Sequence, residues 1–157
     1  MMEKSLTINY CEYADCNGLA PDDRRLLDLA IAATDSAYAP YSHFRVGAAL
    51  RLADGTTVCG SNQENAAYPS GLCAERTAIF AASAQRPDLR DYHTLAIVGR
   101  NPEGVLCQAS PCGACRQVLL EYEQQQHHPL RLLCYLDGGR VRELHSVADL
   151  MPFAFEM

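Results

Sequence analysis

His93-Thr94-Leu95-Ala96-Ile97-Val98-Gly99 is a continuous, largely apolar stretch in the second half of the chain. Such a run is typical of a strand that is buried on both faces of a sheet, because a strand with one exposed face would alternate apolar and polar residues. A second run of this kind occupies residues 130–136. Two such strands predict one central sheet with helices packed against it.

Other strand signals lie on both sides of these runs. Residues 44–52 and 56–61 flank Asp54-Gly55, a dipeptide typical of the turn in a β-hairpin. Residues 140–145 follow the turn signal Asp137-Gly138-Gly139 and predict a further strand, at the edge of the sheet. These segments supply neighbours for the two buried strands.

Helix signals alternate with the strand signals. Pro21-Asp22-Asp23 predicts the start of a helix that ends before Pro40. Residues 72–85 predict a second helix and residues 111–123 a third, while residues 146–150 predict a last helical turn. The alternation places the fold in the α/β class, as a sandwich with one central sheet.

Length and composition predict one compact domain. The chain has 157 residues, 48% of them hydrophobic, and no repeat or linker interrupts it. We expect residues 21–157 to form a single domain and residues 1–20 an N-terminal extension of undefined structure. Because no stretch approaches the roughly 20 apolar residues of a membrane helix, and no secretory signal is visible, we expect a cytoplasmic protein with no membrane partner. In that compartment the eight cysteines should be thiols or metal ligands.

The charge pattern argues against a nucleic-acid partner. The formal net charge is −6, and Lys and Arg are scattered along the chain. A polynucleotide backbone requires a basic stripe that neutralises its phosphates. The sequence therefore favours a small, weakly charged substrate.

Three cysteines have the spacing of an open zinc site. Cys112 and Cys115 are three residues apart at the predicted start of a helix, so both sulfurs lie on one side of it, and Cys73 can supply a third ligand. Three protein ligands leave a tetrahedral zinc ion one position for water, as in catalytic sites. Water bound there is far more acidic than bulk water.

Glu75 lies two residues after Cys73, close enough to accept a proton without binding the metal. This combination, with a Pro-Cys-x-x-Cys motif downstream, is the signature of zinc-dependent nucleobase deaminases. Arg76 has two equally plausible interpretations from local sequence: a donor to the thiolates, or a surface arginine paired with a carboxylate.

Two other classes of protein are compatible with parts of this pattern. A structural zinc module would need a fourth protein ligand, for which the candidates are His43, His93, Cys107 and Cys134. A dithiol redox protein would use Cys112 and Cys115 reversibly and would not need Cys73. The structural module gives Glu75 no role, and the redox protein should bind no stoichiometric zinc.

Over nearly its whole length the chain resembles the small homotetrameric cytidine deaminases of pyrimidine salvage. The matching segments are residues 38–50, 60–69, 73–78 and 110–117. The resemblance implies a three-layer α/β/α sandwich with a central mixed sheet and active sites that neighbouring subunits complete. It also implies deamination of cytidine and 2′-deoxycytidine to uridine and 2′-deoxyuridine, with release of ammonia.

The resemblance also assigns roles to individual residues. It implies one zinc ion per chain on Cys73, Cys112 and Cys115, with Glu75 as proton shuttle and Arg76 in contact with the ligand sulfurs. The implied substrate-binding residues are Phe44, Asn62, Glu64, Ala66, Tyr68, Ala74 and Phe155.

These substrate-binding residues are expected to have different tasks. Phe44, which would otherwise be interpreted as a core residue, stacks on the base in the family. Asn62 and Glu64, otherwise an ordinary polar strand end, hold the ribose, and this pair is absent from the similar blasticidin-type deaminases. Ala66 and Tyr68 resemble residues that reach a neighbouring subunit's sugar.

The C-terminus and one further position depart from the family pattern. Phe155 resembles the final Phe that enters an adjacent active site. However, Phe153 is unusually bulky, and the glycine that often follows the final Phe is absent. Gln63 stands where an aliphatic residue is usual.

Overall fold

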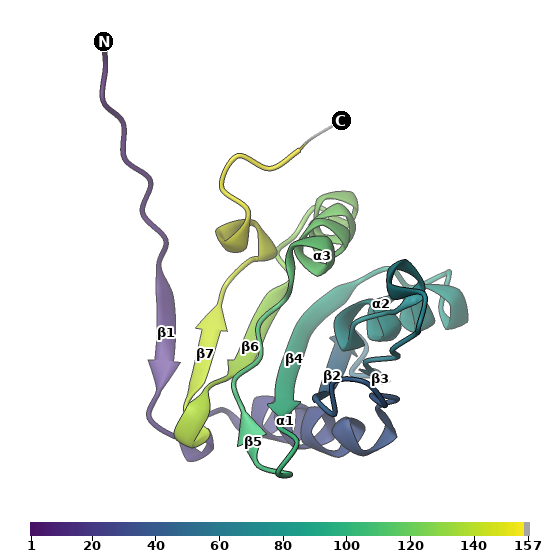
Figure 1. The fold of residues 1–157 in the computed structure, drawn as a ribbon. Helices are drawn as coiled ribbons and strands as arrows, with labels where there is room; N and C mark the ends of the chain where they lie inside the picture. The colour runs from purple at the N-terminus through teal and green to yellow at the C-terminus, as the bar shows by residue number, and fades with distance from the viewer. Residues whose placement is uncertain (156–157) are drawn as a thin grey trace.

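The computed structural model describes residues 1–155, which form a seven-stranded sheet covered by helices (Figure 1). The strands are β1 Tyr10–Tyr13, β2 Arg45–Leu52, β3 Thr57–Ser61, β4 Tyr92–Arg100, β5 Leu106–Cys107, β6 Arg131–Tyr135 and β7 Val141–Leu144. The helices are α1 Pro21–Ala33, α2 Ala74–Gln85 and α3 Gly113–Gln126, with short 3-10 turns between elements. None of the helices described is long and apolar enough to span a bilayer.

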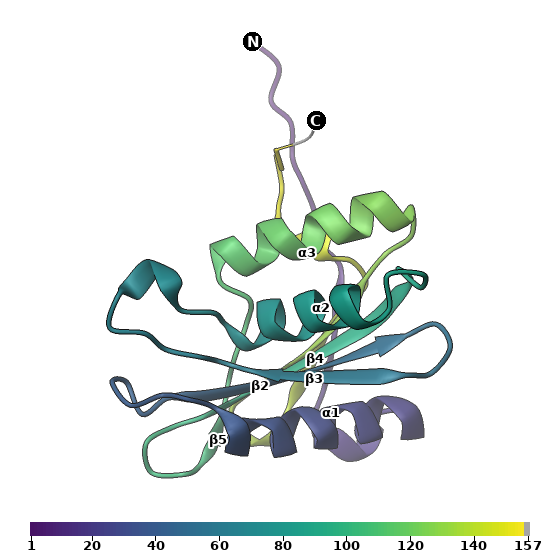
Figure 2. The same ribbon diagram turned by 90° about the vertical axis from the view of Figure 1, so that its right-hand side faces the viewer.

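The sheet is mixed and forms the middle layer of a sandwich. Its order is β1-β7-β6-β4-β2-β3, and β5 pairs with β4. β4 and β6 are parallel, while the other pairs are antiparallel. Figure 2 shows α1 on one face of the sheet and α2 and α3 on the other. The α/β/α sandwich with a central mixed sheet is thereby confirmed.

The apolar run at residues 93–99 lies within β4, the central strand, and its side chains enter two cores. Leu95 and Ile97 belong to the cluster beneath α2 and α3. Ala96 and Val98 belong to the cluster beneath α1, and all four side chains are fully buried. Successive side chains of a strand point to opposite faces, so a strand between two helical layers needs apolar residues at every position.

Two glycines let the helices approach the sheet closely. A Cβ on Gly47 of β2 would lie 2.0 Å from the carbonyl oxygen of Ala30 in α1, and a Cβ on Gly60 of β3 would lie 2.4 Å from the backbone nitrogen of Ala78 in α2. A side chain at either position would push the helix away. The close contact at Gly60 sets the position of α2, and Cys73 and Glu75 lie at the N-terminus of this helix.

The prediction of an edge strand at residues 140–145 was wrong in its placement. β7 lies inside the sheet because β1 pairs along its outer side, with Tyr10 opposite Leu144 and Tyr13 opposite Val141. β1 has only four residues, and a hydrogen bond from the Tyr13 hydroxyl to Glu143 at 2.6 Å helps to hold it. Within residues 1–20 the chain therefore contributes a strand, and Leu19 is buried in the core.

Candidate active site

The three motif cysteines meet where α2 and α3 begin. Cys73 and Cys112 each take an extended conformation immediately before a helix, and Cys115 lies in the first turn of α3. The helix predicted at residues 72–85 included Cys73, but α2 begins at Ala74, and Cys73 is the residue immediately before it. The pairing of two helix starts brings together residues that are 39 positions apart in the chain.

The cysteine sulfurs have the spacing that a tetrahedral zinc ion requires. The three Sγ atoms lie within 4.8 Å of one another, and those of Cys73 and Cys112 are 3.7 Å apart. Tetrahedral Zn–S bonds of about 2.3 Å place two sulfurs about 3.8 Å apart. The residues present therefore fit zinc.

The surroundings of the sulfurs favour a thiolate. The pKa of Cys73 is lowered to about 5, first by a hydrogen bond from the Cys115 thiol and then by Arg76, against the effect of burial. The pKa of Cys115 is raised correspondingly, because loss of its proton would break that bond. The positive ends of two helix dipoles add to the stabilisation of negative charge here.

No fourth ligand joins the three sulfurs among residues 1–155. The group of His, Cys, Asp and Glu side chains at ligand distance contains only the three cysteines. His43, His93, Cys107 and Cys134, the candidates for a closed structural site, lie outside it. The arrangement favours an open coordination position, which a structural module lacks.

Glu75 lies beside this cluster in the first turn of α2. Its side chain is 3% exposed, and burial raises its pKa to about 7, helped by the negative charge of Cys73. A carboxyl group with a pKa near neutral can both accept and return a proton at physiological pH. Its burial, pKa and proximity suit a general acid and base.

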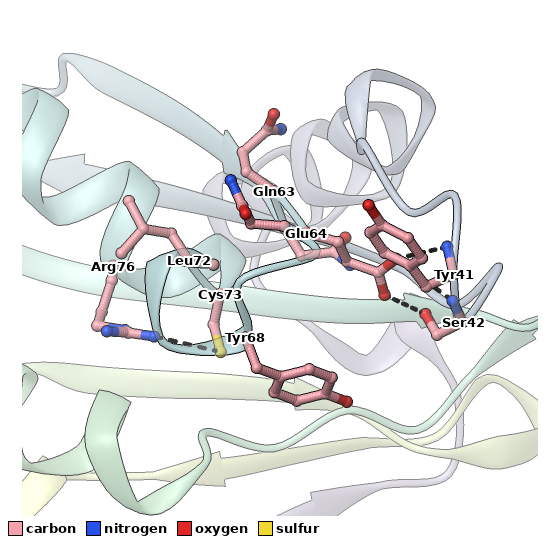
Figure 3. A pocket seen from close by; sticks show the side chains of 11 residues that line it. Tyr41, Ser42, Gln63, Glu64, Tyr68, Leu72, Cys73 and Arg76 are labelled. Carbon is pink, nitrogen blue, oxygen red and sulfur yellow. Dashed lines mark hydrogen bonds between the residues drawn. The ribbon is translucent and has the colours of Figure 1, made fainter.

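Arg76 faces the sulfurs, not a carboxylate. Its Nη2 lies 3.9 Å from the Cys73 sulfur, and Cys115 also accepts from its guanidinium. Figure 3 shows the Arg76 side chain directed toward Cys73. Of the two interpretations from local sequence, the geometry supports contact with the thiolates.

Two adjacent cavities open beside the cysteines. One, of about 470 Å³, is drawn in Figure 3. The other, of about 420 Å³, reaches Glu75 and two of the cysteines. Both are lined by Ser42, Asn62, Glu64 and Cys73.

The second cavity has three kinds of wall. Phe44 and Val46 form an apolar wall, and residues 108–110 approach from the loop before α3. Cys73, Glu75 and Cys112 form the reactive wall. A planar, partly polar molecule could lie between an aromatic ring and a proton-transfer group here.

Asn62 fixes the backbone on both sides of Arg45. Its Oδ1 accepts from the backbone nitrogen of Val46 at 2.7 Å, and its Nδ2 donates to the carbonyl oxygen of Phe44 at 2.9 Å. Each end of the amide retains one hydrogen-bonding position, since a side-chain amide has two donors and two lone pairs. Asn62 thus positions Phe44 and can still contact a ligand.

Glu64 is bound by the loop before Phe44. Its carboxylate accepts from the backbone nitrogens of Tyr41, at 2.9 Å, and Ser42, at 3.3 Å, and from the Ser42 hydroxyl. These bonds, the hydroxyl's first, hold the pKa of Glu64 below its ordinary value. A carboxylate offers about four acceptor positions, so one remains open.

The other predicted contact residues are placed differently. Tyr68 lines the larger cavity and is 92% exposed. Ala66 is exposed and Ala74 fully buried, and neither lines either cavity. Phe155 is exposed on the C-terminal tail and lines neither cavity of its own chain.

Sequence reasoning assigned no role to several lining residues, notably Ser42 and Gln108. Ser42 lines both cavities and Gln108 the one beside Glu75. A signal for Ser42 was present, because a serine two residues before Phe44 can accept from that residue's backbone N–H in a local turn. Gln108 carries no comparable local signal.

Comparison with known proteins agrees with this geometry. Residues 20–127 match the family model described as the cytidine and deoxycytidylate deaminase zinc-binding region. The cytidine deaminase of Halalkalibacterium halodurans is 41% identical over 136 residues, 85% of this chain and 94% of that protein. That of Sporosarcina psychrophila is 46% identical over 136 residues, 85% of this chain and 91% of the relative.

Solved structures show the same likeness. The crystal structure of cytidine deaminase from Burkholderia pseudomallei has a TM-score of 0.72 and 42% identity, covering 83% of this chain and 97% of that one. The cytidine deaminase from Mycobacterium tuberculosis has a TM-score of 0.68 and 36% identity, covering 88% and 100%. The family match spans more than half of the chain and includes all three motif cysteines and Glu75. This chain therefore belongs to the cytidine and deoxycytidylate deaminase family and is an enzyme, a hydrolase that acts on C–N bonds.

Proposed function

We propose that this enzyme hydrolyses cytidine and 2′-deoxycytidine to uridine and 2′-deoxyuridine, with release of ammonia, in pyrimidine salvage. One observation carries the proposal: three cysteine sulfurs at zinc-ligand spacing lie beside a buried Glu75, in a cavity that Phe44 also lines. Residues 21–157 would then belong to a single catalytic domain, which β1 joins through its pairing with β7.

Cys73, Cys112 and Cys115 would hold one zinc ion per chain. When bound, zinc supplies a water molecule that is acidic enough to ionise near neutral pH. Arg76 would moderate the negative charge of the three thiolates through its contacts with Cys73 and Cys115.

Glu75 would carry the protons of the reaction. Its carboxylate takes a proton from water and delivers it to ring nitrogen N3, which makes C4 more electrophilic. After water oxygen has added to C4, Glu75 transfers the second proton to the amino group, and the C4–N bond breaks to give ammonia and the uracil ring. The raised pKa, about 7, suits both halves of this cycle.

The free hydrogen-bonding positions of Asn62 and Glu64 support turnover of both nucleosides. Asn62 retains one donor, and Glu64 retains one acceptor position, as described above. One sugar hydroxyl can satisfy both, accepting from Asn62 and donating to Glu64. A nucleoside that lacks one ring hydroxyl can therefore still be held, while the base stacks on Phe44.

Assembly and location are part of the proposal. We infer a homotetramer in which Ala66, Tyr68 and Phe155 serve neighbouring active sites, supported by the exposure of all three side chains. Ala74 would contact substrate through its backbone, because its side chain is buried. The eight free cysteines suit a reducing compartment such as the cytoplasm.

The proposal is tested by following the loss of absorbance when purified, zinc-quantified protein is mixed with cytidine, 2′-deoxycytidine, cytosine and blasticidin S in parallel. We expect rapid turnover of the two nucleosides with about one zinc ion per chain. Turnover of a non-ribosyl compound alone would contradict the roles of Asn62 and Glu64. Full zinc occupancy without any turnover would contradict a catalytic role for the zinc site.

A further inference from the structure

We propose that Ser42 is a positioning residue that couples the base-stacking side chain Phe44 to the sugar-binding carboxylate of Glu64. This inference rests on the proposed function and adds to it a residue that decides how firmly a nucleoside is held. It is carried by a chain of hydrogen bonds that joins the two ends of the substrate site.

The Ser42 side chain bonds to both groups at once. Its Oγ accepts from the backbone nitrogen of Phe44 at 3.0 Å and donates its proton to Glu64 Oε1. The backbone nitrogens of Tyr41 and Ser42 donate to Oε2 of the same carboxylate. Figure 3 shows Tyr41 and Ser42 together on one side of the Glu64 carboxylate, joined to it by hydrogen bonds.

The turn that makes this chain possible is closed by residues on both sides of Ser42. His43 has a positive φ of 56°, a conformation that non-glycine residues rarely adopt. Its backbone nitrogen donates to the carbonyl oxygen of Ala39 at 3.1 Å. The left-handed conformation of His43 directs the Phe44 N–H toward the Ser42 hydroxyl. The hydrogen bond between these two groups stabilises the turn.

Phe44 is consequently fixed at both ends of its backbone. Ser42 accepts from its nitrogen, and Asn62 donates to its carbonyl oxygen at 2.9 Å. The tip of the Phe44 ring also lies close to Gly99: a Cβ added to Gly99 would be 2.9 Å from Cζ of Phe44. Loss of the Ser42 hydroxyl would free one of these three restraints.

Glu64 depends on Ser42 in the same way. Two of the three hydrogen bonds to its carboxylate come from backbone nitrogens. The third comes from the Ser42 hydroxyl, and among these three it alone can be removed by substituting a side chain. Without it, Oε1 has no donor from the protein among the contacts described and can rotate away from the position that faces a sugar hydroxyl. Cys73, Glu75 and Cys112 lie on other elements and keep their contacts.

The expected result is therefore a change in binding and not in the chemical step. Ser42→Ala should raise KM for cytidine about tenfold and leave kcat within about twofold, because the lost contacts serve ground state and transition state alike. Ser42→Thr keeps the hydroxyl, so its KM should lie close to that of the unaltered enzyme. Ser70→Ala, an exposed serine outside both cavities, is the matched control and should change neither constant.

A truncated substrate separates positioning from general loosening of the loop. 2′,3′-Dideoxycytidine has no ring hydroxyl for Glu64, so its inhibition constant against cytidine turnover should rise in Ser42→Ala by much less than the KM for cytidine. Equal changes for the two ligands, a fall in kcat alone, or no change would overturn the proposal. Absence of cytidine turnover by the unaltered enzyme would overturn the proposed function and this inference together, whereas normal turnover with any of those three results would overturn this inference alone.

Discussion

The carboxylate of Glu123, buried near the C-terminal end of α3, accepts a hydrogen bond from the Ser146 hydroxyl at 2.6 Å. It also accepts from the backbone nitrogens of Leu130 and Val147, each at 2.8 Å. One side chain thus holds the entry to β6 and the turn after β7 against the helix that carries Cys115.

Removal of this carboxylate should destabilise the fold. Glu123→Ala leaves several donors without their acceptor in a buried place, and we expect the free energy of unfolding to fall by about 3 kcal/mol. Glu121→Ala, an exposed glutamate on the same helix, should change it by about 0.5 kcal/mol or less. Urea denaturation of both variants measures the difference, and equal midpoints would contradict the assigned role.

The close approach of α2 to β3 makes a second prediction. Gly60→Ala places a methyl group 2.4 Å from a backbone nitrogen of α2, so we expect a loss of about 2 to 3 kcal/mol in stability. Turnover should also fall, because the N-terminus of α2 carries Glu75. Cys59→Ala, at the exposed neighbouring position, is the control. A Gly60→Ala protein as stable as this control would show that α2 shifts without penalty.

Glu75→Gln should separate the proton shuttle from the fold. The substitution keeps the shape of the side chain but cannot carry protons, so kcat for cytidine should fall by about 10² to 10⁴-fold or more. Zinc content and thermal unfolding temperature should stay close to those of the unaltered protein. Activity within a few-fold of normal would refute the shuttle role.

The cysteine cluster predicts a specific pattern of zinc loss. Cys112→Ser removes one of three protein ligands, so zinc content after dialysis should fall well below one ion per chain. Cys59→Ser, which changes an exposed thiol on β3, should retain it. Metal analysis by mass spectrometry tests this without an activity assay. Similar zinc content in the two variants would place the metal elsewhere.

The pH dependence of KM provides a prediction about Glu64. Its pKa in the folded protein is lowered, chiefly by the Ser42 hydroxyl, so the carboxylate stays ionised at a pH where an ordinary glutamate has begun to take up a proton, about 4.3. In Ser42→Ala the pKa of Glu64 should lie nearer the ordinary value. As pH falls, KM for cytidine should therefore begin to rise at a lower pH in the unaltered enzyme than in Ser42→Ala.

This comparison requires KM measurements for both proteins from about pH 7 to about pH 4. The substrate's own titration is common to both curves and cancels from the difference. A rise at the same pH in both proteins, or at lower pH in Ser42→Ala, would contradict the contribution of the hydroxyl.

Local patterns predicted the features that depend on neighbouring residues. The apolar run at residues 93–99 predicted a doubly buried strand, since every position of β4 must suit one of two apolar layers. The spacing of Cys112 and Cys115 predicted a shared ligand site, because a helix start presents both sulfurs on one side. The sequence did not predict β1, because the strand is short and polar. Its position in the sheet depends on residues far away in the chain, such as Glu143.

The sequence by itself determined the chemistry: three thiols, one carboxyl group and the class of reaction that they permit. Only the tertiary structure decided which groups act together, as in the Ser42–Glu64 and Glu123–Ser146 contacts, which join residues 22 and 23 positions apart. The physical reason is that metal-ligand spacing and strand periodicity are local properties of the chain. A hydrogen bond between distant side chains exists only after packing of the sheet and helices has brought donor and acceptor together.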